Sequence, residues 1–275
     1  MNDLRKMTEQ LNSTERMPVL FIGHGSPMNA IEENEFVQGF RKAASEIPQP
    51  AAIVCVSAHW ETRGTFVTAM EKPKTIHDFD GFSEELYRGQ YPAPGKPGLA
   101  KEIKDEVKRT EIGLDSNWGL DHGTWSVIKH MYPDADVPVV QMSLDYQQTP
   151  QHHYELAKEL SFLRNKGVLI IGSGNMVHNL RLVDWRNLDK EDYGYDWALE
   201  AREKMKKYIL SGDHKQLINY QAQGKEFSLA IPTPEHYLPL LYTLALKDDE
   251  DRVSTFNDKA LAGSLTMTSV KIGKE

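Results

Sequence analysis

The chain has 275 residues, 40% hydrophobic and 26% charged, a composition typical of a globular protein and unlike that of a disordered one. Its formal net charge of −8 argues against nucleic acid or an anionic membrane surface as a partner, because both select for clustered Lys and Arg. No apolar segment approaches the ~20 residues that a membrane-spanning helix needs.

The N-terminal segment and the cysteine content bear on the compartment. Residues 1–16 are polar and have neither the apolar core nor the small-residue cleavage site of a signal peptide. We expect them to form an arm ahead of a single domain at residues 17–275. The one cysteine, Cys55, excludes an intrachain disulfide, and its place in the apolar segment AAIVCV predicts a buried packing residue. Together these features predict a cytoplasmic protein.

Apolar segments alternate with amphipathic ones along the chain, and this alternation predicts an α/β fold. In the first half of the chain we expect a strand at 17–22, a helix near 32–46, a strand at 51–57, a helix at 99–109 and a short helix that ends at 131. In the second half we expect a strand at 137–144, a helix near 151–165, a strand at 167–171, helices near 197–210, 213–221 and after 236, and a strand at 263–272. The strands before residue 172 are apolar on both faces, as expected of strands with helices on either side. The predicted architecture is a central, mostly parallel or mixed sheet flanked by helices.

A long segment without regular structure is expected at residues 71–98, which are rich in proline, glycine and aromatic residues. Irregular segments of this length are uncommon unless they have a function. We therefore expect this segment to be a lid or a pocket wall.

Four histidines lie where an α/β protein binds ligands. His24, His59 and His178 each follow a predicted buried strand, and the C-terminal edge of an open α/β sheet is where ligand sites form. His236 is expected in the first turn of a helix, with Thr233 as N-cap and Pro234 at the first helical position. Rigid elements on all sides make such side chains suitable metal ligands.

Three protein ligands and an open position are common in catalytic metal sites, and neutral imidazole suits Zn, Fe, Cu and Ni. Three histidines, or two histidines and Glu235, could form such a site. Adjacent helical residues point about 100° apart, which favours His236 over Glu235 as the ligand. The residues alone support a metal site and a set of separate structural histidines about equally. Four other histidines, His130, His152, His153 and His214, are expected to be solvated.

The turn Gly172-Ser173-Gly174 could hold a phosphate. It lacks the third glycine of a dinucleotide-binding fingerprint and the lysine of a P-loop, so this interpretation is weak.

Long motifs in a fixed order carry a resemblance to a known family: GHGSPMNAIEEN, VSAHW, IHDFDGF, YPAPG, WGLDHGTW, MYPDADVPVVQMSL, GSGNMVHNL and PTPEHYLPLLY. Together they resemble the class III, or LigB-type, extradiol dioxygenases, and within them the bacterial and plant 4,5-DOPA extradiol dioxygenase-like proteins. The resemblance runs from about Met17 to Gly273. It implies a LigB-type fold for residues 17–275, with that segment as the catalytic domain.

The resemblance also implies an activity and roles for five histidines. The family cleaves a catechol ring beside its two hydroxyls, using Fe(2+) and O2, and bacterial members also hold Zn(2+). One divalent ion would be bound by His24, His59 and His236. His178 would be the acid/base, and His122 a second-sphere residue that touches substrate or oxygen. The expected substrate is L-DOPA or a similar catechol.

The sequence departs from the family pattern in one loop. Where the family has HDFGGFP, this chain has HDFDGFS, with Asp80 in place of glycine and Ser83 in place of proline. We expect a change of loop conformation and no change of the metal ligands. Ser26, Trp60, Trp125 and Tyr237 flank the predicted ligands, and either a ring pocket or core packing would explain them.

Two other functions fit the same residues. A zinc hydrolase would use three histidines and an activated water, and zinc binds such ligands more tightly than Fe(2+) does. A non-catalytic scaffold that binds a protein partner would keep the fold without needing the histidines, and their presence argues against it. The sequence does not predict an oligomeric state.

Overall fold

The structure is a computed structural model that describes residues 16–188 and 190–274. The predicted N-terminal arm lies outside the described residues except for Arg16. Within the described part of the chain, no helix is both long and apolar enough to cross a membrane.

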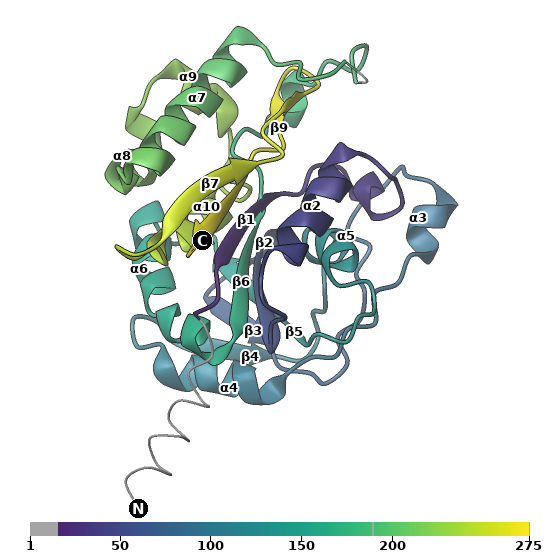
Figure 1. Cartoon of the computed structure of the whole chain (residues 1–275), viewed down its shortest axis with the longest axis vertical. Coiled ribbons are helices and arrows are strands. Elements are labelled where there is room, and N and C mark those ends of the chain that lie inside the picture. The colour runs from purple at the N-terminus through teal and green to yellow at the C-terminus, as the bar shows by residue number, and fades with distance from the viewer. Residues whose placement is uncertain (1–15, 189, 275) are drawn as a thin grey trace, which may run out of the picture.

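One eight-stranded mixed sheet forms the centre of the molecule (Figure 1). Its strands are β1 (Val19–Gly23), β2 (Ala52–Thr62), β3 (Thr65–Thr68), β4 (Ile112–Asp115), β5 (Val139–Asp145), β6 (Val168–Gly174), β7 (Arg252–Phe256) and β10 (Ser269–Gly273), in the spatial order β4-β3-β5-β2-β6-β1-β10-β7. The four central strands β5, β2, β6 and β1 are parallel to one another. Antiparallel pairs join β3 to β5, β10 to β1 and β7 to β10. The predicted α/β fold with a mixed sheet is confirmed.

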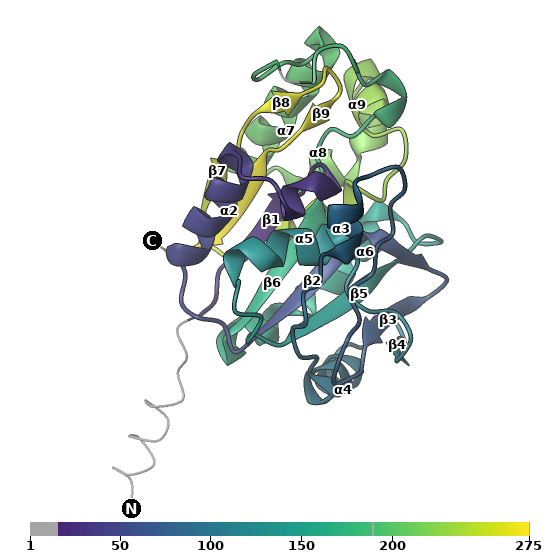
Figure 2. The ribbon, with the colours of Figure 1, turned by 90° about the vertical axis from the view of Figure 1, so that its right-hand side faces the viewer.

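Helices cover both faces of this sheet. They are α2 (Glu35–Ser45), α3 (Glu84–Arg88), α4 (Pro97–Glu106), α5 (His122–Met131), α6 (Pro150–Lys158), α7 (Asp196–Ser211), α8 (His214–Ile218), α9 (Lys225–Ala230) and α10 (Leu238–Ala245). Short 3-10 turns lie at η1 (Pro27–Ala30), η2 (Ser161–Lys166), η3 (Leu180–Leu182) and η4 (Tyr220–Ala222). Helices α2 and α5 lie side by side on one face, and α6 packs on α10 against the other (Figures 1 and 2). Helices α7, α8 and α9 gather at one end, near the small hairpin of β8 (Ala260–Leu261) and β9 (Leu265–Thr266).

The alternation of side chains along a strand divides the core in two. On β1, Val19 and Phe21 belong to one apolar cluster, whereas Leu20 and Ile22 belong to the other. Burying both faces removes apolar surface from water on each side of the sheet, which is the main force that stabilises it. Cys55 is fully buried, as predicted, and burial raises the pKa of its thiol.

The edges of the sheet differ from the prediction. Strands β3, β4 and β7 were not foreseen; β4 and β7 lie at the two edges, and their partly exposed side chains give no long apolar pattern. The predicted strand at 263–272 is divided into β9 and β10. The predicted irregular segment 71–98 is confirmed except for the short helix α3 and the first residues of α4.

The prediction that His153 is solvated is wrong. It is fully buried between α6 and α10, where its Nδ1 lies 3.0 Å from the hydroxyl of Tyr242. His130 and His214 are partly buried, and each has a hydrogen-bond partner. An amphipathic helix shows which positions are apolar, but it does not show that a histidine at its edge will meet a second helix.

A buried ion pair ties η2 to the segment before β7. Arg164 donates to both carboxylate oxygens of Asp251, at 2.6 and 2.9 Å, and also to the carbonyls of Met17 and Leu246. The two charged side chains are 1% and 0% exposed. Removal of one partner therefore leaves a buried charge without compensation.

We predict that Asp251→Ala lowers the free energy of unfolding by about 3–5 kcal/mol, because the Arg164 guanidinium stays buried and unpaired. Urea unfolding followed by circular dichroism measures this. Glu84→Ala, which removes the exposed Arg88–Glu84 pair, is the matched control and should change little. Equal small losses in both variants would contradict the prediction.

We also predict that His153 makes stability depend on pH. Burial lowers its pKa from 6.5 to about 4, so between these values the unfolded chain binds the proton more readily than the folded one. This contribution is present above pH 6.5 and is lost as the pH falls toward 4, by up to about 3 kcal/mol. The variant His153→Gln should show a correspondingly flatter decline in unfolding free energy over this range. Parallel curves for the two proteins would rule the effect out.

Candidate metal centre

The parallel strands β2, β6 and β1 are neighbours, and their C-terminal ends form the floor of the site. Gly23 pairs with Gly174 at the end of β1 and β6, so His24 emerges beside the segment that leads to His178. The backbone N–H of His24 donates to the Gly174 carbonyl at 3.1 Å. His24 therefore lies at the edge of the sheet where the sequence predicts it.

The prediction that His59 follows its strand is wrong, because the residue lies within β2. Strand β2 continues to Thr62, and its pairing with β5 shifts register between Val56 and Glu61. The strand was expected to end at Ser57 because polar residues begin there. Ser57 is nevertheless buried, and its hydroxyl accepts from the His59 N–H at 3.2 Å.

His122 is the first residue of α5, and the N-cap Asp121 positions it. The Asp121 carboxylate accepts hydrogen bonds from the Thr124 N–H, from the Ser57 hydroxyl at 2.7 Å and from the Gln141 amide. Burial, with Asp78 nearby, raises the pKa of Asp121 to about 6. Gly123 has no room for a side chain, because a Cβ there would lie 2.6 Å from the Ser57 hydroxyl and 2.8 Å from the His59 ring.

His236 lies in a turn before α10, not in the first turn of that helix as predicted. The helix begins at Leu238, and the Thr233 hydroxyl donates to the Glu235 carboxylate at 2.8 Å instead of capping backbone N–H groups. The Pro234 carbonyl accepts from the N–H groups of Tyr237 and Leu238, which closes the turn.

The glycines of Gly172-Ser173-Gly174 serve close packing and not a phosphate. A Cβ at Gly174 would lie 2.1 Å from the His236 carbonyl, and one at Gly172 would lie 2.3 Å from the Pro239 carbonyl. These two glycines therefore let the turn that carries His236 approach β6, with the Asn175 N–H donating to the His236 carbonyl at 2.8 Å.

His178 lies four residues beyond β6, and its ring stacks on that of His236. The ring centroids are 3.6 Å apart with an angle of 7° between the planes. Its backbone N–H donates to the Ala230 carbonyl at 2.9 Å. Within the described part of the chain, the ring nitrogens of His178 have no hydrogen-bond partner, so they are free to exchange a proton.

All five predicted histidines converge. The ring centroids of His24, His59 and His236 are 4.9–5.3 Å apart, and that of His122 lies 3.9 Å from His59. By ligand-atom distance they form two groups, each with all atoms within 4.8 Å: His24, His59 and His122, and His178, Glu235 and His236. The predicted ligand set takes two members from the first group and one from the second.

An oxygen atom lies near Nδ1 of both His24 and His59. The Ser173 hydroxyl donates to the Gly123 carbonyl and so accepts from Nδ1 of His24, 3.0 Å away. Nδ1 of His59 lies 3.5 Å from the Asp78 carboxylate. The two Nε2 atoms face one another at 3.1 Å, which is an arrangement that a shared cation would stabilise.

Two carboxylates orient the other rings. Asp78 Oδ2 lies 2.9 Å from Nδ1 of His122, while its Oδ1 accepts from the His122 N–H at 2.8 Å. Glu235 Oε1 lies 3.2 Å from Nδ1 of His236. Burial by itself raises the pKa of each carboxyl, but hydrogen bonds from the histidines outweigh it, so the pKa of Asp78 is lowered and that of Glu235 falls to about 2. Both are carboxylates at neutral pH.

Burial lowers the pKa of four of these imidazoles, those of His24, His59, His178 and His236, and so favours their neutral form. Burial lowers the pKa of His24 and of His59 well below the ordinary value, and the neighbouring imidazoles lower both further. Burial, with His236 beside it, lowers the pKa of His178 to about 3. Neutral imidazoles with Nδ1 bound to oxygen and Nε2 free are the form that binds divalent metals, so these residues fit such an ion.

Sequence reasoning missed the residues that orient the ligands. Asp78 lies in the motif HDFDGF, from which the sequence predicts only a change of loop conformation, and Ser173 lies in a turn for which it predicts only a weak phosphate site. The flanking aromatic residues belong to the core: the Trp125 indole donates to the Ile76 carbonyl and the Tyr237 hydroxyl to the Leu217 carbonyl. Trp60 is buried and stacks on Trp118. Ser26 is exposed and caps η1.

We predict that Asp78→Asn weakens binding of Zn(2+) or Co(2+) by about 10- to 100-fold, because one carboxylate orients both His59 and His122. Competition with a chromophoric chelator measures the dissociation constant. Asp80→Asn, two residues away on the exposed side of the same loop, should bind metal like the unchanged protein. Equal affinity in both variants would show that Asp78 has no such role.

Comparisons with known proteins show the family to which this chain belongs. Residues 18–269 match the family described as "Catalytic LigB subunit of aromatic ring-opening dioxygenase". The chain is 46% identical over 265 residues to "4,5-DOPA dioxygenase extradiol" of Escherichia coli K12, covering 95% of this chain and 96% of that protein. It is 33% identical to a protein of the same description from Beta vulgaris, covering 91% and 94%.

A solved structure is similar over nearly the whole chain. The crystal structure of an uncharacterized protein from Escherichia coli K12 superimposes with a TM-score of 0.82 and 41% identity, covering 94% of this chain and all of that one. The predicted family is therefore confirmed: this chain belongs to the family of the catalytic LigB subunit of aromatic ring-opening dioxygenases.

Proposed function

We propose that this protein is a metal-dependent dioxygenase that cleaves the ring of a catechol, L-DOPA or a close analogue, in extradiol fashion with O2. The observation that carries the proposal is the convergence of five histidines, two of which face each other through Nε2 at 3.1 Å. Membership of the ring-opening family, and relatives described as 4,5-DOPA dioxygenases, support the reaction and the substrate. We also propose a cytoplasmic location, as the sequence predicts.

His24, His59 and His236 would hold one divalent ion through Nε2. Each has an oxygen near its Nδ1, from Ser173, Asp78 and Glu235 respectively, which fixes the tautomer that a metal needs. Fe(2+) is the ion expected for ring cleavage, and Zn(2+) fits the same donors. When bound, the iron supplies Lewis acidity toward the catechol oxygens and the redox chemistry that O2 requires.

Glu235 would act as an orienting group and not as a ligand. Its Oε1 already accepts from the Thr233 hydroxyl at 2.8 Å and lies 3.2 Å from Nδ1 of His236. Both contacts hold the Glu235 carboxylate beside Nδ1 of His236.

His178 would be the acid/base. Its imidazole is neutral and its nitrogens are unengaged within the described residues, so it can accept a proton from a catechol hydroxyl as the substrate binds. The same proton can later return to an oxygen of the opened ring. Stacking on His236 keeps the imidazole beside the proposed metal without making it a ligand.

His122 would orient the substrate. Asp78 lies 2.9 Å from its Nδ1, which leaves Nε2 as an acceptor for the second catechol hydroxyl. Its place at the start of α5, fixed by the Asp121 cap, gives this acceptor a definite position.

We predict that protein loaded anaerobically with Fe(2+), then given L-DOPA and air, consumes O2 and forms a yellow ring-cleavage product. His178→Ala should lower kcat by 100-fold or more, in the range of about 10²–10⁴ typical of a lost acid/base, while metal content measured by mass spectrometry is retained. His214→Ala, which removes a histidine paired with Tyr154 outside the cluster, should leave kcat unchanged.

Three outcomes would count against the proposal. No oxygen uptake with L-DOPA, protocatechuate or caffeate would exclude ring cleavage, and zinc-dependent hydrolysis without O2 would favour a hydrolase. Loss of bound metal in His178→Ala would identify His178 as a ligand.

A further inference from the structure

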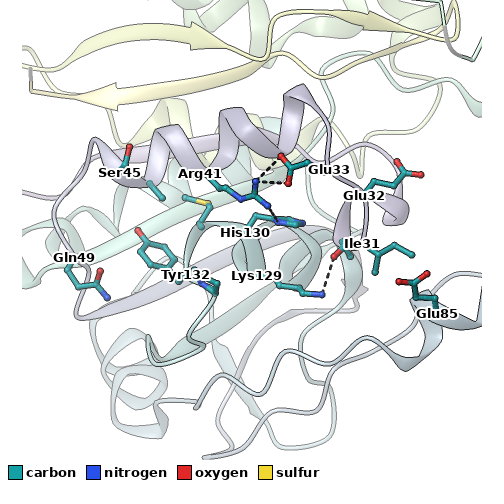
Figure 3. Close-up of a pocket in the computed structure, with 14 residues that line it drawn as sticks. Ile31, Glu32, Glu33, Arg41, Ser45, Gln49, Glu85, Lys129, His130 and Tyr132 are labelled. Carbon is teal, nitrogen blue, oxygen red and sulfur yellow. Dashed lines mark hydrogen bonds and ion pairs between the residues drawn. The ribbon is translucent and has the colours of Figure 1, made fainter.

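A surface cavity of about 770 Å³ lies between α2 and the C-terminal end of α5, and its wall includes Arg41, Lys129 and His130 (Figure 3). None of the five converging histidines lines it. The cavity wall is nevertheless connected to His24 by a continuous series of hydrogen bonds.

The series begins with His130, whose tautomer follows from its neighbours. Arg41, held by an ion pair with Glu33, directs NH2 toward Nδ1 of His130 at 3.4 Å (Figure 3). A guanidinium only donates, so Nδ1 accepts and Nε2 carries the proton. Nε2 then donates to the Asn29 carbonyl at 2.6 Å.

The side chain of Asn29 continues the series to His24. Its Nδ2 donates to the His24 carbonyl at 2.8 Å, and its Oδ1 accepts from Nδ2 of Asn34 at 2.8 Å. The Asn34 amide cannot be reversed, because its own Oδ1 already accepts from two N–H groups at the start of α2. The orientation of the Asn29 amide is therefore fixed, and Asn29 is only 5% exposed.

This contact is one of two hydrogen bonds that hold the backbone of His24. Its N–H is bound by the Gly174 carbonyl of β6, whereas its carbonyl is bound by Asn29. The next residue, Gly25, has φ +66°, so the chain turns sharply just beyond the histidine. Without a donor to the His24 carbonyl, no hydrogen bond fixes the orientation of the peptide group between His24 and Gly25. The His24 ring would then shift with the backbone.

We propose that Asn29 is a positioning residue for the metal site, held in place by His130 from the cavity wall. This inference rests on the proposed function only in taking His24 as a metal ligand. Neither Asn29 nor His130 would touch the metal or the substrate. Their effect would reach the metal through the backbone of His24.

The test is the affinity for Co(2+), measured by competition with a chelator, together with the visible spectrum of the bound Co(2+). In Asn29→Ala the dissociation constant should rise about tenfold or more, the effect typical of residues that orient ligands, and the Co(2+) absorption bands should shift. In His130→Phe, which keeps a ring but has no donor, a smaller rise in the same direction is expected. His130→Gln, whose amide can donate to the Asn29 carbonyl, should recover the affinity of the unchanged protein.

Lys129→Ala is the matched control. Lys129 lies next to His130 and donates to the Ala30 carbonyl at 3.1 Å, one residue beyond Asn29, without a link to His24. It should bind Co(2+) like the unchanged protein.

An unchanged dissociation constant and spectrum in both Asn29→Ala and His130→Phe would overturn the inference. So would an equal loss in Lys129→Ala, because that would indicate general loosening of η1. Metal binding without ring cleavage in the unchanged protein would refute the proposed activity alone, so failure of the activity and failure of the inference give different results.

Discussion

Parallel pairing of β2, β6 and β1 is the constraint on which the rest of the site depends. Ser173 of β6 pairs with Ser57 of β2 on one side and with Ile22 of β1 on the other, so the three strands reach the same level together. Whatever follows them must meet at one edge of the sheet. Glycines at 172 and 174 then allow the backbone around His236 to approach from the other side, where any side chain would collide with a carbonyl.

The histidines fit a metal ion because oxygen atoms lie near the ring nitrogens that face away from the centre of the cluster. Ser173, Asp78 and Glu235 place oxygen atoms near the Nδ1 atoms, and each oxygen comes from a different part of the chain. Burial lowers the pKa of the His24 and His59 imidazoles and favours their neutral form, since a low-dielectric environment disfavours the charged form. The site therefore combines a rigid base, formed by strand ends, with a second layer of oxygens that determines which nitrogen faces inward.

Helix α5 connects two regions of the molecule. Its first residue, His122, lies in the histidine cluster. In its last turn, His130 donates to the Asn29 carbonyl and Lys129 donates to the Ala30 carbonyl. The helix is capped by Asp121, which is also bound to β2 through Ser57. Because one rigid helix contacts the site directly and also the segment that follows His24, the position of the site and the packing of α2 on α5 are linked.

The sequence alone determined the α/β class and the buried central strands, because apolar periodicity is a local feature. Its ordered motifs also singled out five histidines whose rings lie close together. Only the tertiary structure decided that β2 extends through His59 and that His236 lies in a turn before its helix, since the pairing of β2 with β5 and the close approach to Gly174 bring together residues far apart in the chain. The same holds for His153, whose burial depends on a second helix. Asp78 and Ser173 gave no local signal of their roles, because a hydrogen bond to a histidine 44 or 149 residues away exists only once the strands are assembled. Asn29 lies only five residues from His24, but the His130 side chain that binds its carbonyl is 101 residues away.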